Sequence, residues 1–217
     1  MTNISTEDYI KAVYKIEERG EKATTSQLAL QLDVADASIT DMIKKLSEKG
    51  LLHYEKYQGV ELTAKGRKMA LGILRRHRLW EMFLMQFLGY SWDKVHEEAE
   101  RLEHVTSEEL EGRLDKALGY PIVDPHGDPI PGKDGTMSGT ESSALTECEV
   151  GEVVRVSRVS DTNSELLQHA TQIGVGLNSK LTIREKKAFD GSMVVKVGSK
   201  QQFISQQVAE AIFVERM

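Results

Sequence analysis

The sequence predicts a mainly helical α+β protein in which a long helical part precedes a small C-terminal β-barrel. Apolar residues recur at helical spacing from Thr6 to about residue 118. All four prolines lie within residues 119–140, a stretch that no helix can cross and that forms either a linker or an ordered loop. Beyond it the pattern changes to short β-rich runs at 150–159, 180–185, 192–197 and 211–216, and four or five short strands in one terminal segment are typical of a small barrel.

The N-terminal part predicts a helix-turn-helix. Its three expected helices span residues 6–19, 25–32 and 36–48; Thr6 caps the first, Thr25 or Ser26 opens the second, and Gly50 ends the third. Four apolar residues of the third helix recur at i, i+3, i+4 and i+7, namely Ile39, Met42, Ile43 and Leu46. The opposite side of that helix is polar and basic, and two short helices joined by a tight turn with such a second helix are typical of this motif.

A β-hairpin is expected directly after these helices, which makes the unit a winged helix. Residues 51–62 are rich in β-formers and are interrupted at Gln58-Gly59. In such a unit, hydroxyl and basic side chains on the second helix of the motif and around it contact phosphates and base edges of DNA. The candidates are Thr25, Ser38, Thr40, Lys44, Lys45, Lys49 and Lys56.

Charge and cysteine content narrow the classes of protein to which this chain can belong. The chain of 217 residues has a net charge of −6, but residues 79–150 hold 5 basic against 16 acidic residues, a net −11. No apolar stretch approaches the ~18 residues of a membrane span, and no secretory signal opens the chain. A single cysteine, Cys148, excludes a disulfide framework and a thiolate-rich metal site. We therefore expect a cytoplasmic protein that does not associate with a membrane.

Histidines and carboxylates recur at helical spacing in the acidic part. His77 and Glu81 are four residues apart, and a second set, His96, Glu100, Glu103 and His104, occupies one stripe of a helix expected over 91–104. Such a stripe is either a solvated acidic face or a set of metal ligands. The two histidines of the stripe would be about 12 Å apart, too far for one ion, so any metal binding requires two sites. Carboxylates and imidazoles without thiolate favour Mn²⁺, Fe²⁺ or Zn²⁺, and oxygen-rich sets favour manganese.

Three runs of sequence stand out: KVHEEAERLEH at 94–104, RRHRLWEMFL at 75–84, and GVELTAKG at the end of the winged helix. Together they resemble the diphtheria toxin repressor family. The resemblance extends over nearly the whole chain. It implies a winged-helix DNA-binding domain at 1–73, a helical metal-binding and dimerisation domain with a proline-rich connector at 74–140, and an SH3-like domain at 141–217.

The resemblance also implies a function and a set of ligands. The family consists of metal-dependent repressors of iron and manganese uptake genes, which bind double-stranded operator DNA as homodimers. The matching positions of the activating site are Asp8, Glu100, Glu103 and His104. Those of the second site are His77, Glu81 and His96. The segment Asp124-Pro125-His126 adds Asp124 and His126 to this site, and Asp161 adds an acidic residue. Carboxylates at Asp8 and Glu100, where the iron-responsive branch has sulfur ligands, resemble the manganese-responsive branch. The expected ion is Mn²⁺, with Fe²⁺ as a further activator and Zn²⁺, Co²⁺ or Cd²⁺ as surrogates.

Two other classes of function compete with this interpretation. One is a metal-independent winged-helix regulator that responds to a small molecule, its acidic helix being only a solvated face. The other is a metalloenzyme, but the sequence contains no HExxH, GxSxG or P-loop pattern, so we expect neither catalysis nor a small-molecule substrate. An apolar run is expected to form the dimer interface or an intradomain core: Leu79, Trp80, Met82, Phe83, Met85, Phe87 and Leu88.

Overall fold

The computed structural model describes residues 6–55, 59–137, 139 and 142–217. Lys56 and Gln58, both named above, lie outside the described residues. The chain divides into two compact units, the first comprising residues up to Arg76 with Pro131–Thr136, the second His77–Ile130 with Met137–Met217. The division falls within one long helix, α4 (Ala64–Leu88). The three-domain boundaries expected from the sequence stay a prediction.

The first unit contains the predicted helix-turn-helix and wing. Helices α1 (Thr6–Glu17), α2 (Thr25–Leu32) and α3 (Asp36–Glu48) precede the antiparallel strands β1 (Leu52–Glu55) and β2 (Gly59–Leu62). Three of the four residues of the predicted apolar face of α3, Ile39, Ile43 and Leu46, are fully buried in one hydrophobic core with residues of α1 and the wing. The fourth, Met42, is partly buried against that core. The winged helix is confirmed.

The start of α2 differs from the prediction and shows how the turn before it is held. Thr24, not Thr25 or Ser26, is the N-cap: its hydroxyl accepts a hydrogen bond from the Gln27 N–H, while the Gln27 side chain accepts one from the Thr24 N–H. This capping box satisfies two backbone donors that a helix start leaves free. At the other end Asp33 adopts a left-handed conformation, with φ 52°, and turns the chain toward α3.

The helical part of the second unit corrects the predicted helix over 91–104. After α4 the chain makes a turn, and α5 spans only Val95–Leu102. Glu103–Val105 form a 3₁₀ turn, η1, followed by α6 (Glu108–Ala117) with Ser107 as its N-cap. The predicted helix over 91–104 is therefore wrong in its bounds. A 3₁₀ turn advances 120° per residue instead of 100°, but over two residues this keeps Glu103 and His104 beside Glu100, and ligand atoms of the three lie within 4.8 Å of one another.

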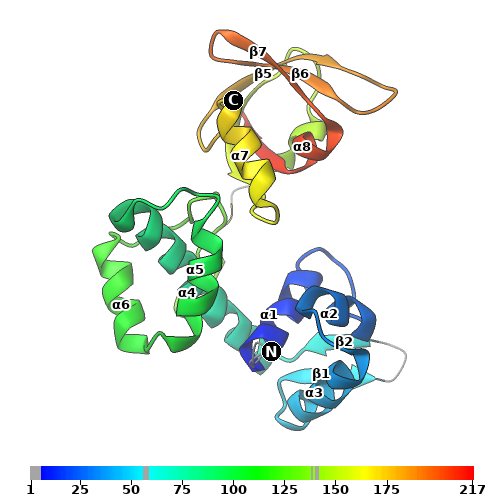
Figure 1. Ribbon diagram of the computed structural model, residues 1–217, viewed down its shortest axis with the longest axis vertical. Helices are drawn as coiled ribbons and strands as arrows, with labels where there is room; N and C mark the ends of the chain where they lie inside the picture. Colours follow the sequence, from blue (N-terminus) through cyan, green and yellow to red (C-terminus); the bar gives the residue numbers. More distant parts are fainter. Residues whose placement is uncertain (1–5, 56–58, 138, 140–141) are drawn as a thin grey trace. The chain divides into compact units, whose positions relative to one another are not determined.

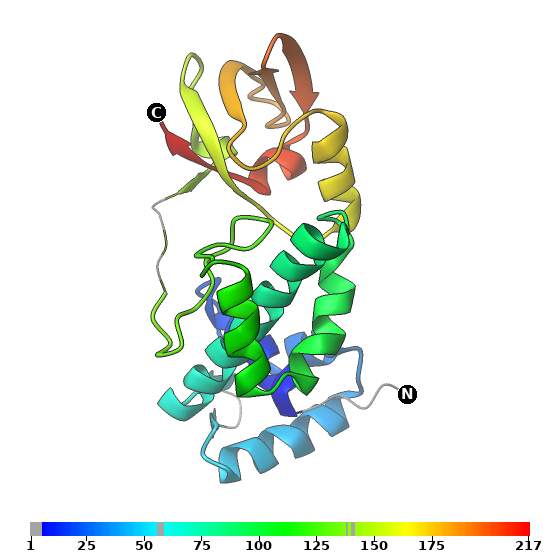
Figure 2. The same cartoon turned by 90° about the vertical axis from the view of Figure 1, so that its left-hand side faces the viewer.

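The proline-rich segment after α6 is an ordered loop in its first half. Residues 119–130 contain no helix (Figure 2). An isolated β-bridge joins Val123 to Pro129. Within this loop one oxygen of Asp124 accepts hydrogen bonds from the N–H groups of His126, at 2.8 Å, and Asp128, at 2.9 Å. Asp124 and His126 are buried. Of the two alternatives left open by the sequence, the ordered loop is correct for these residues.

The C-terminal part is a six-stranded antiparallel sheet with the order β3-β8-β4-β5-β6-β7. Its strands are β3 (Ser143–Ala144), β4 (Val153–Val159), β5 (Lys180–Lys186), β6 (Met193–Val197), β7 (Lys200–Ile204) and β8 (Ile212–Arg216). Helices α7 (Ser164–Gln172) and α8 (Gln206–Glu210) lie beside the sheet (Figure 1). The sequence pattern did not predict β3, α7 or α8 and left β7 open. The predicted fold class is confirmed.

Cys148 lies in the core of this sheet, where burial raises the pKa of its thiol. This agrees with the interpretation of Cys148 as an ordinary core residue. Among the helices of the described residues, none is long and apolar enough to cross a membrane.

Candidate metal centre

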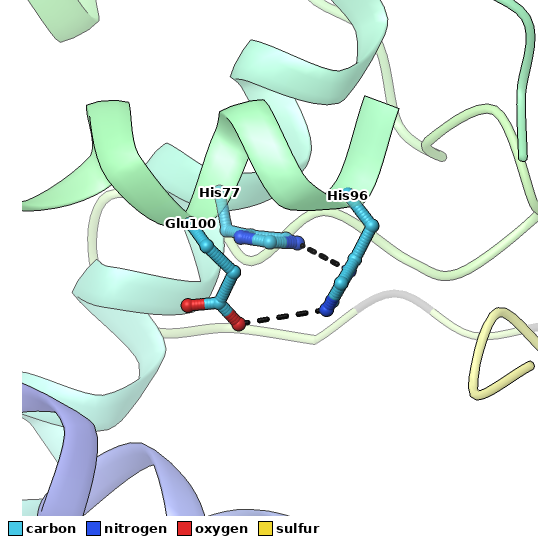
Figure 3. Close-up of side chains that lie close together, drawn as sticks. All are labelled: His77, His96 and Glu100. Carbon is cyan, nitrogen blue, oxygen red and sulfur yellow. Dashed lines mark hydrogen bonds and ion pairs between the residues drawn. The ribbon is translucent and has the colours of Figure 1, made fainter. Parts of the chain in front are cut away.

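The helices α4 and α5 bring four of the expected ligands together. Nε2 of His77 lies 3.0 Å from Oε1 of Glu81, one turn further along α4, and 3.1 Å from Nδ1 of His96 on α5. His96 in turn lies 3.5 Å from Oε1 of Glu100. Figure 3 shows the two imidazoles and the carboxylate of Glu100 turned toward one another. The i, i+4 spacing seen in the sequence thus places both pairs on facing sides of two packed helices.

A second group forms where α5 passes into the 3₁₀ turn. One ligand atom from each of Glu100, Glu103 and His104 lies within 4.8 Å of the others. Glu103 is fully buried, and its two oxygens contact two histidines: Oε1 lies 3.4 Å from Nε2 of His104, and Oε2 lies 2.6 Å from Nδ1 of His77. His77 therefore joins Glu103 of this group to Glu81, with one ring nitrogen facing each carboxylate.

A third group is closed off from solvent. It consists of Glu81 from α4 and of Asp124 and His126 from the proline-rich loop, each at most 2% exposed. Oε2 of Glu81 lies 3.9 Å from Nδ1 of His126, and neither atom has a hydrogen-bond partner among the residues that the structure describes. Oδ1 of Asp124 lies 4.0 Å from the same nitrogen. We call Glu81, Asp124 and His126 the buried cluster.

The pKa values of the two carboxylates in the buried cluster are shifted in opposite directions. Burial alone would raise the pKa of Glu81, but the adjacent His77, His96 and His126 hold it well below its ordinary value. Burial and the charges of Glu81 and Asp128 raise the pKa of Asp124 well above its ordinary value, against the opposing effect of Arg78. A buried carboxylate whose charge is disfavoured, beside two acceptor atoms without donors, is the environment that a cation relieves. The donor set therefore fits a divalent ion.

Asp161, which follows β4, lies beside these groups. Its Oδ2 is 3.5 Å from Nδ1 of His96, and ligand atoms of Glu81, His96 and Asp161 lie within 4.8 Å of one another. The sequence named Asp161 as a ligand contributed by the last domain, and the structure places it next to two others of the same expected set. All six residues expected in the second site thus belong to overlapping groups around Glu81.

Two residues that the sequence did not single out support the loop of the buried cluster. Arg78 is buried; its Nε lies 3.5 Å from Oδ2 of Asp124, its Nη2 lies 3.5 Å from Asp128, and its Nη1 donates to the carbonyl oxygen of Pro129. Trp92 accepts a hydrogen bond from His126 on its backbone oxygen. Neither contact leaves a signal in the sequence, since one joins residues far apart and the other uses a backbone atom.

The expected DNA-contacting residues lie in the first unit. On α3, Ser38, Lys44 and Lys45 are exposed, and neither lysine forms an ion pair with any residue in the described part of the chain. Thr40 is half-buried, and its hydroxyl donates to the carbonyl oxygen of Asp36 within the same helix. Thr25 is half-buried in the first turn of α2. The lysines and Ser38 are therefore the most accessible of the five.

Asp8, the remaining expected ligand, lies in the first turn of α1. It belongs to the first unit, whereas Glu100, Glu103 and His104 belong to the second. Its part in the activating site stays a prediction.

A winged helix-turn-helix, together with groups of carboxylates and imidazoles suited to a divalent ion, defines a metal-responsive DNA-binding regulator. Family models match three consecutive segments: the iron dependent repressor N-terminal DNA binding domain over residues 1–60, its metal binding and dimerisation domain over 63–132, and the FeoA domain over 144–216. The iron-dependent repressor IdeR of Mycobacterium leprae is 32% identical over 98% of this chain and 97% of its own length. The diphtheria toxin repressor of Corynebacterium diphtheriae is 26% identical over 98% of this chain and 97% of its own.

Comparison with solved structures points to the same family. A manganese-dependent transcriptional repressor in complex with manganese superposes with a TM-score of 0.92 at 38% identity, covering 98% of this chain and 100% of that one. The manganese regulator SloR superposes with a TM-score of 0.80 at 36% identity, covering 98% and 99%. The chain belongs to the diphtheria toxin repressor family of metal-dependent transcriptional repressors.

Proposed function

We propose that this protein is a manganese-activated repressor that controls genes of metal-ion uptake, with Fe²⁺ as a further activating ion. The observation that carries the proposal is the buried cluster, in which two acceptor atoms 3.9 Å apart have no donor among the described residues. Its donors are oxygen and imidazole nitrogen only, and this set favours Mn²⁺ or Fe²⁺ over the softer ions. Zn²⁺, Co²⁺ and Cd²⁺ act as surrogates, in keeping with solved relatives described with bound Zn²⁺ and Cd²⁺.

The switch that we propose joins the first helix to the acidic turn after α5. Asp8 acts as the ligand from α1, and Glu100, Glu103 and His104 act as the ligands from the second unit. Without the ion their carboxylates repel one another, so the DNA-binding unit samples many positions. With it, the joined arrangement is favoured, because a ligand shifts a population by its preference for one state. That arrangement is the one that presents α3 to DNA.

Repression requires two copies of α3 on one operator. Phe87 and Leu88, at the end of α4, are 56% and 58% exposed, and Phe87 stacks on Phe83 with ring centroids 5.0 Å apart. The exposed apolar side chains of Phe87 and Leu88, beside the half-buried Phe83, support the proposal that this end of α4 lies in the homodimer interface. A symmetric dimer places its two recognition helices about 34 Å apart, which matches successive major grooves of a palindromic operator.

The remaining parts of the proposal follow from this role. A regulator of this kind acts in the cytoplasm, where it meets chromosomal DNA. It catalyses no reaction, takes no small-molecule substrate and needs no membrane. Its relatives are named as transcriptional repressors, which supports the regulator over an enzyme.

The proposal is tested by the thermodynamic linkage between ion and operator. Because coupling is reciprocal, operator DNA should tighten Mn²⁺ binding by the factor by which Mn²⁺ tightens operator binding. The operator is selected from a DNA library with Mn²⁺ present, and binding is then measured with Mn²⁺, Fe²⁺, Zn²⁺ and chelator. Equal Mn²⁺ affinity with and without operator contradicts the mechanism. Operator binding that chelator does not affect favours the metal-independent regulator instead.

A further inference from the structure

One nitrogen of His126 is committed to a hydrogen bond that prepares the other for an ion. Nε2 of His126 donates to the backbone oxygen of Trp92 at 2.7 Å. The proton of a neutral imidazole therefore lies on Nε2, and Nδ1, the atom that faces Glu81, carries the free lone pair. Since a ligating histidine is held in its tautomer and orientation by such an outer partner, the position of the Trp92 carbonyl matters for ion binding.

Trp92 is itself held by the helix α7. Its indole Nε1–H donates to Oγ1 of Thr171 at 2.9 Å, and the next residue, Asp93, accepts a hydrogen bond of 2.9 Å from the Gln168 side chain. Thr171 and Gln168 are one turn apart on the same face of α7. The indole also stacks on the imidazole of His126, with ring centroids 5.9 Å apart and planes 20° apart. Both the ring and the backbone of Trp92 thus contact the ligand.

The other side of His126 is held by strand β4. The backbone oxygen of His126 accepts a hydrogen bond from the Val159 N–H at 2.8 Å. Gly127 has φ +93°, and a Cβ on it would lie 2.1 Å from the carbonyl oxygen of Ser157, so only glycine permits this close approach. His126 is fully buried between these partners. Apart from Asp124, which is itself an expected ligand and accepts from the His126 N–H, the side chain that contacts His126 here is the indole of Trp92, and Thr171 holds that indole.

We propose that Thr171, acting through Trp92, is a positioning residue for the ion ligand His126, and that Gln168 assists it through Asp93. The C-terminal part of the chain thereby sets the ion affinity of the buried cluster from outside its ligand shell. This inference rests on the proposed function, because it concerns the same ion. Loss of a direct outer partner of a metal ligand lowers affinity by about 10–100-fold; because Thr171 acts one contact further out, we expect a loss at the lower end of that range, about tenfold.

The experiment uses the full chain and the fluorescence of Trp92. The sequence contains two tryptophans, so Trp80→Phe leaves Trp92 as the only one. Mn²⁺ is paramagnetic, and its binding beside the stacked His126 should quench Trp92. In this background Thr171→Val removes the acceptor of the indole N–H, Thr171→Ser keeps it, and Thr182→Val on β5 is a control of equal chemistry. The melting temperature of each ion-free variant is measured alongside, as are Mn²⁺ affinities by calorimetry.

Thr171→Val should move the midpoint of the Mn²⁺ titration to about tenfold higher concentration, while Thr171→Ser and Thr182→Val leave it unchanged. Thr171 is exposed, so the melting temperatures of the ion-free variants should agree. Equal midpoints for Thr171→Val and Thr171→Ser overturn the inference; if operator binding still depends on Mn²⁺, the proposed function survives. Absence of Mn²⁺ binding in every variant, in both fluorescence and calorimetry, overturns both.

Discussion

Two of the ligand groups in the second unit differ in how far their side chains are closed off from solvent. In the buried cluster, Glu81, Asp124 and His126 are at most 2% exposed and come from α4 and one ordered loop. In the group of Glu100, Glu103 and His104, which we call the open group, the side chains of Glu100 and His104 are 34% and 24% exposed, although Glu103 is fully buried. The first is closed around its donors, whereas the second keeps part of its ligand surface open to solvent.

This difference indicates a division of labour. A closed set of preoriented donors stabilises the fold when an ion binds, because binding to the native state alone adds to stability. An open group can accept a ligand from elsewhere, which is what a switch requires. His77 contacts both, at 2.6 Å to Glu103 and 3.0 Å to Glu81, so filling the buried cluster orients a ligand of the open group. We therefore expect substitutions in the two groups to separate operator binding from stability.

The largest effect is expected from Asp8→Asn, which removes the predicted ligand from outside the second unit. Operator affinity in saturating Mn²⁺ should fall by about 100-fold or more, since losing a ligand costs more than the 10–100-fold cost of losing an outer partner. Mn²⁺ should still raise the melting temperature, because the buried cluster is intact. Fluorescence anisotropy with labelled operator and a thermal melt measure the two quantities.

Glu18→Gln is the matched control for this prediction, since Glu18 is exposed just beyond the end of the same helix. It should bind operator as the unmodified chain does. A variant Asp8→Asn with normal Mn²⁺-dependent operator affinity would show that the open group acts without α1.

The next effect is expected from Glu81→Gln, which removes a charge from the buried cluster. An ion at 100 times its Kd stabilises the native state by about 2.7 kcal/mol. Losing this contribution should lower the Mn²⁺-induced rise in melting temperature by roughly 5–10 °C for a chain of this size. Operator affinity should fall only about tenfold, through the His77 bridge. Calorimetry should count one Mn²⁺ fewer per chain; an unchanged count contradicts the assignment, and exposed Glu97→Gln serves as the control.

Much of this arrangement could be predicted from local pattern. The spacing of Ile39, Ile43 and Leu46 predicted the buried face of α3, and i, i+4 spacing predicted the contacts of His77 with Glu81 and of His96 with Glu100. Both follow from the helix repeat alone. The grouping of Glu81 with the proline-rich loop required the family resemblance, because no local pattern joins α4 to a loop over 40 residues later.

Other features lay beyond local pattern for physical reasons. The end of α5 at Leu102 depends on a tightening of the backbone that residue types do not encode strongly. Helix α7 was not predicted, although Asn163 caps it, because it is short and its apolar residues are few. Without α7 the role of Thr171 cannot be seen, and the acceptor of His126 is a backbone oxygen that any residue would offer.

A smaller effect is expected from Asp124→Asn, which should change folding stability in opposite directions in the ion-free and ion-bound states. The pKa of Asp124 is raised by burial and by Glu81 and Asp128, so the folded ion-free protein holds this proton more tightly than the unfolded chain. Stability therefore falls as pH rises from the ordinary aspartate pKa, about 3.9, toward the raised one. Asparagine removes this loss and keeps the acceptor for the N–H groups of His126 and Asp128.

The ion-free Asp124→Asn variant should therefore melt roughly 2–4 °C higher at neutral pH, which corresponds to about 1 kcal/mol. The difference should vanish below pH 4. In Mn²⁺ the order should reverse, since the unmodified chain regains the charge as a ligand. Thermal melts across pH, with chelator and with Mn²⁺, measure the stability difference in the two states. If the ion-free variant is less stable than the unmodified chain at every pH, the buried charge of Asp124 does not destabilise the ion-free fold and the prediction is wrong.

The smallest effect is expected from Lys44→Ala, which touches neither ligand group. Lys44 is exposed on α3 and has no ion-pair partner among the described residues, so its predicted role is a contact to one DNA phosphate. Removing one such contact lowers the slope of log affinity against log salt by about 0.9. Operator affinity should fall a few-fold at physiological salt, and the Mn²⁺ midpoint should not move. If the slope is unchanged while Lys68→Ala, an exposed lysine of α4, alters it, then DNA is read by a face other than that of α3.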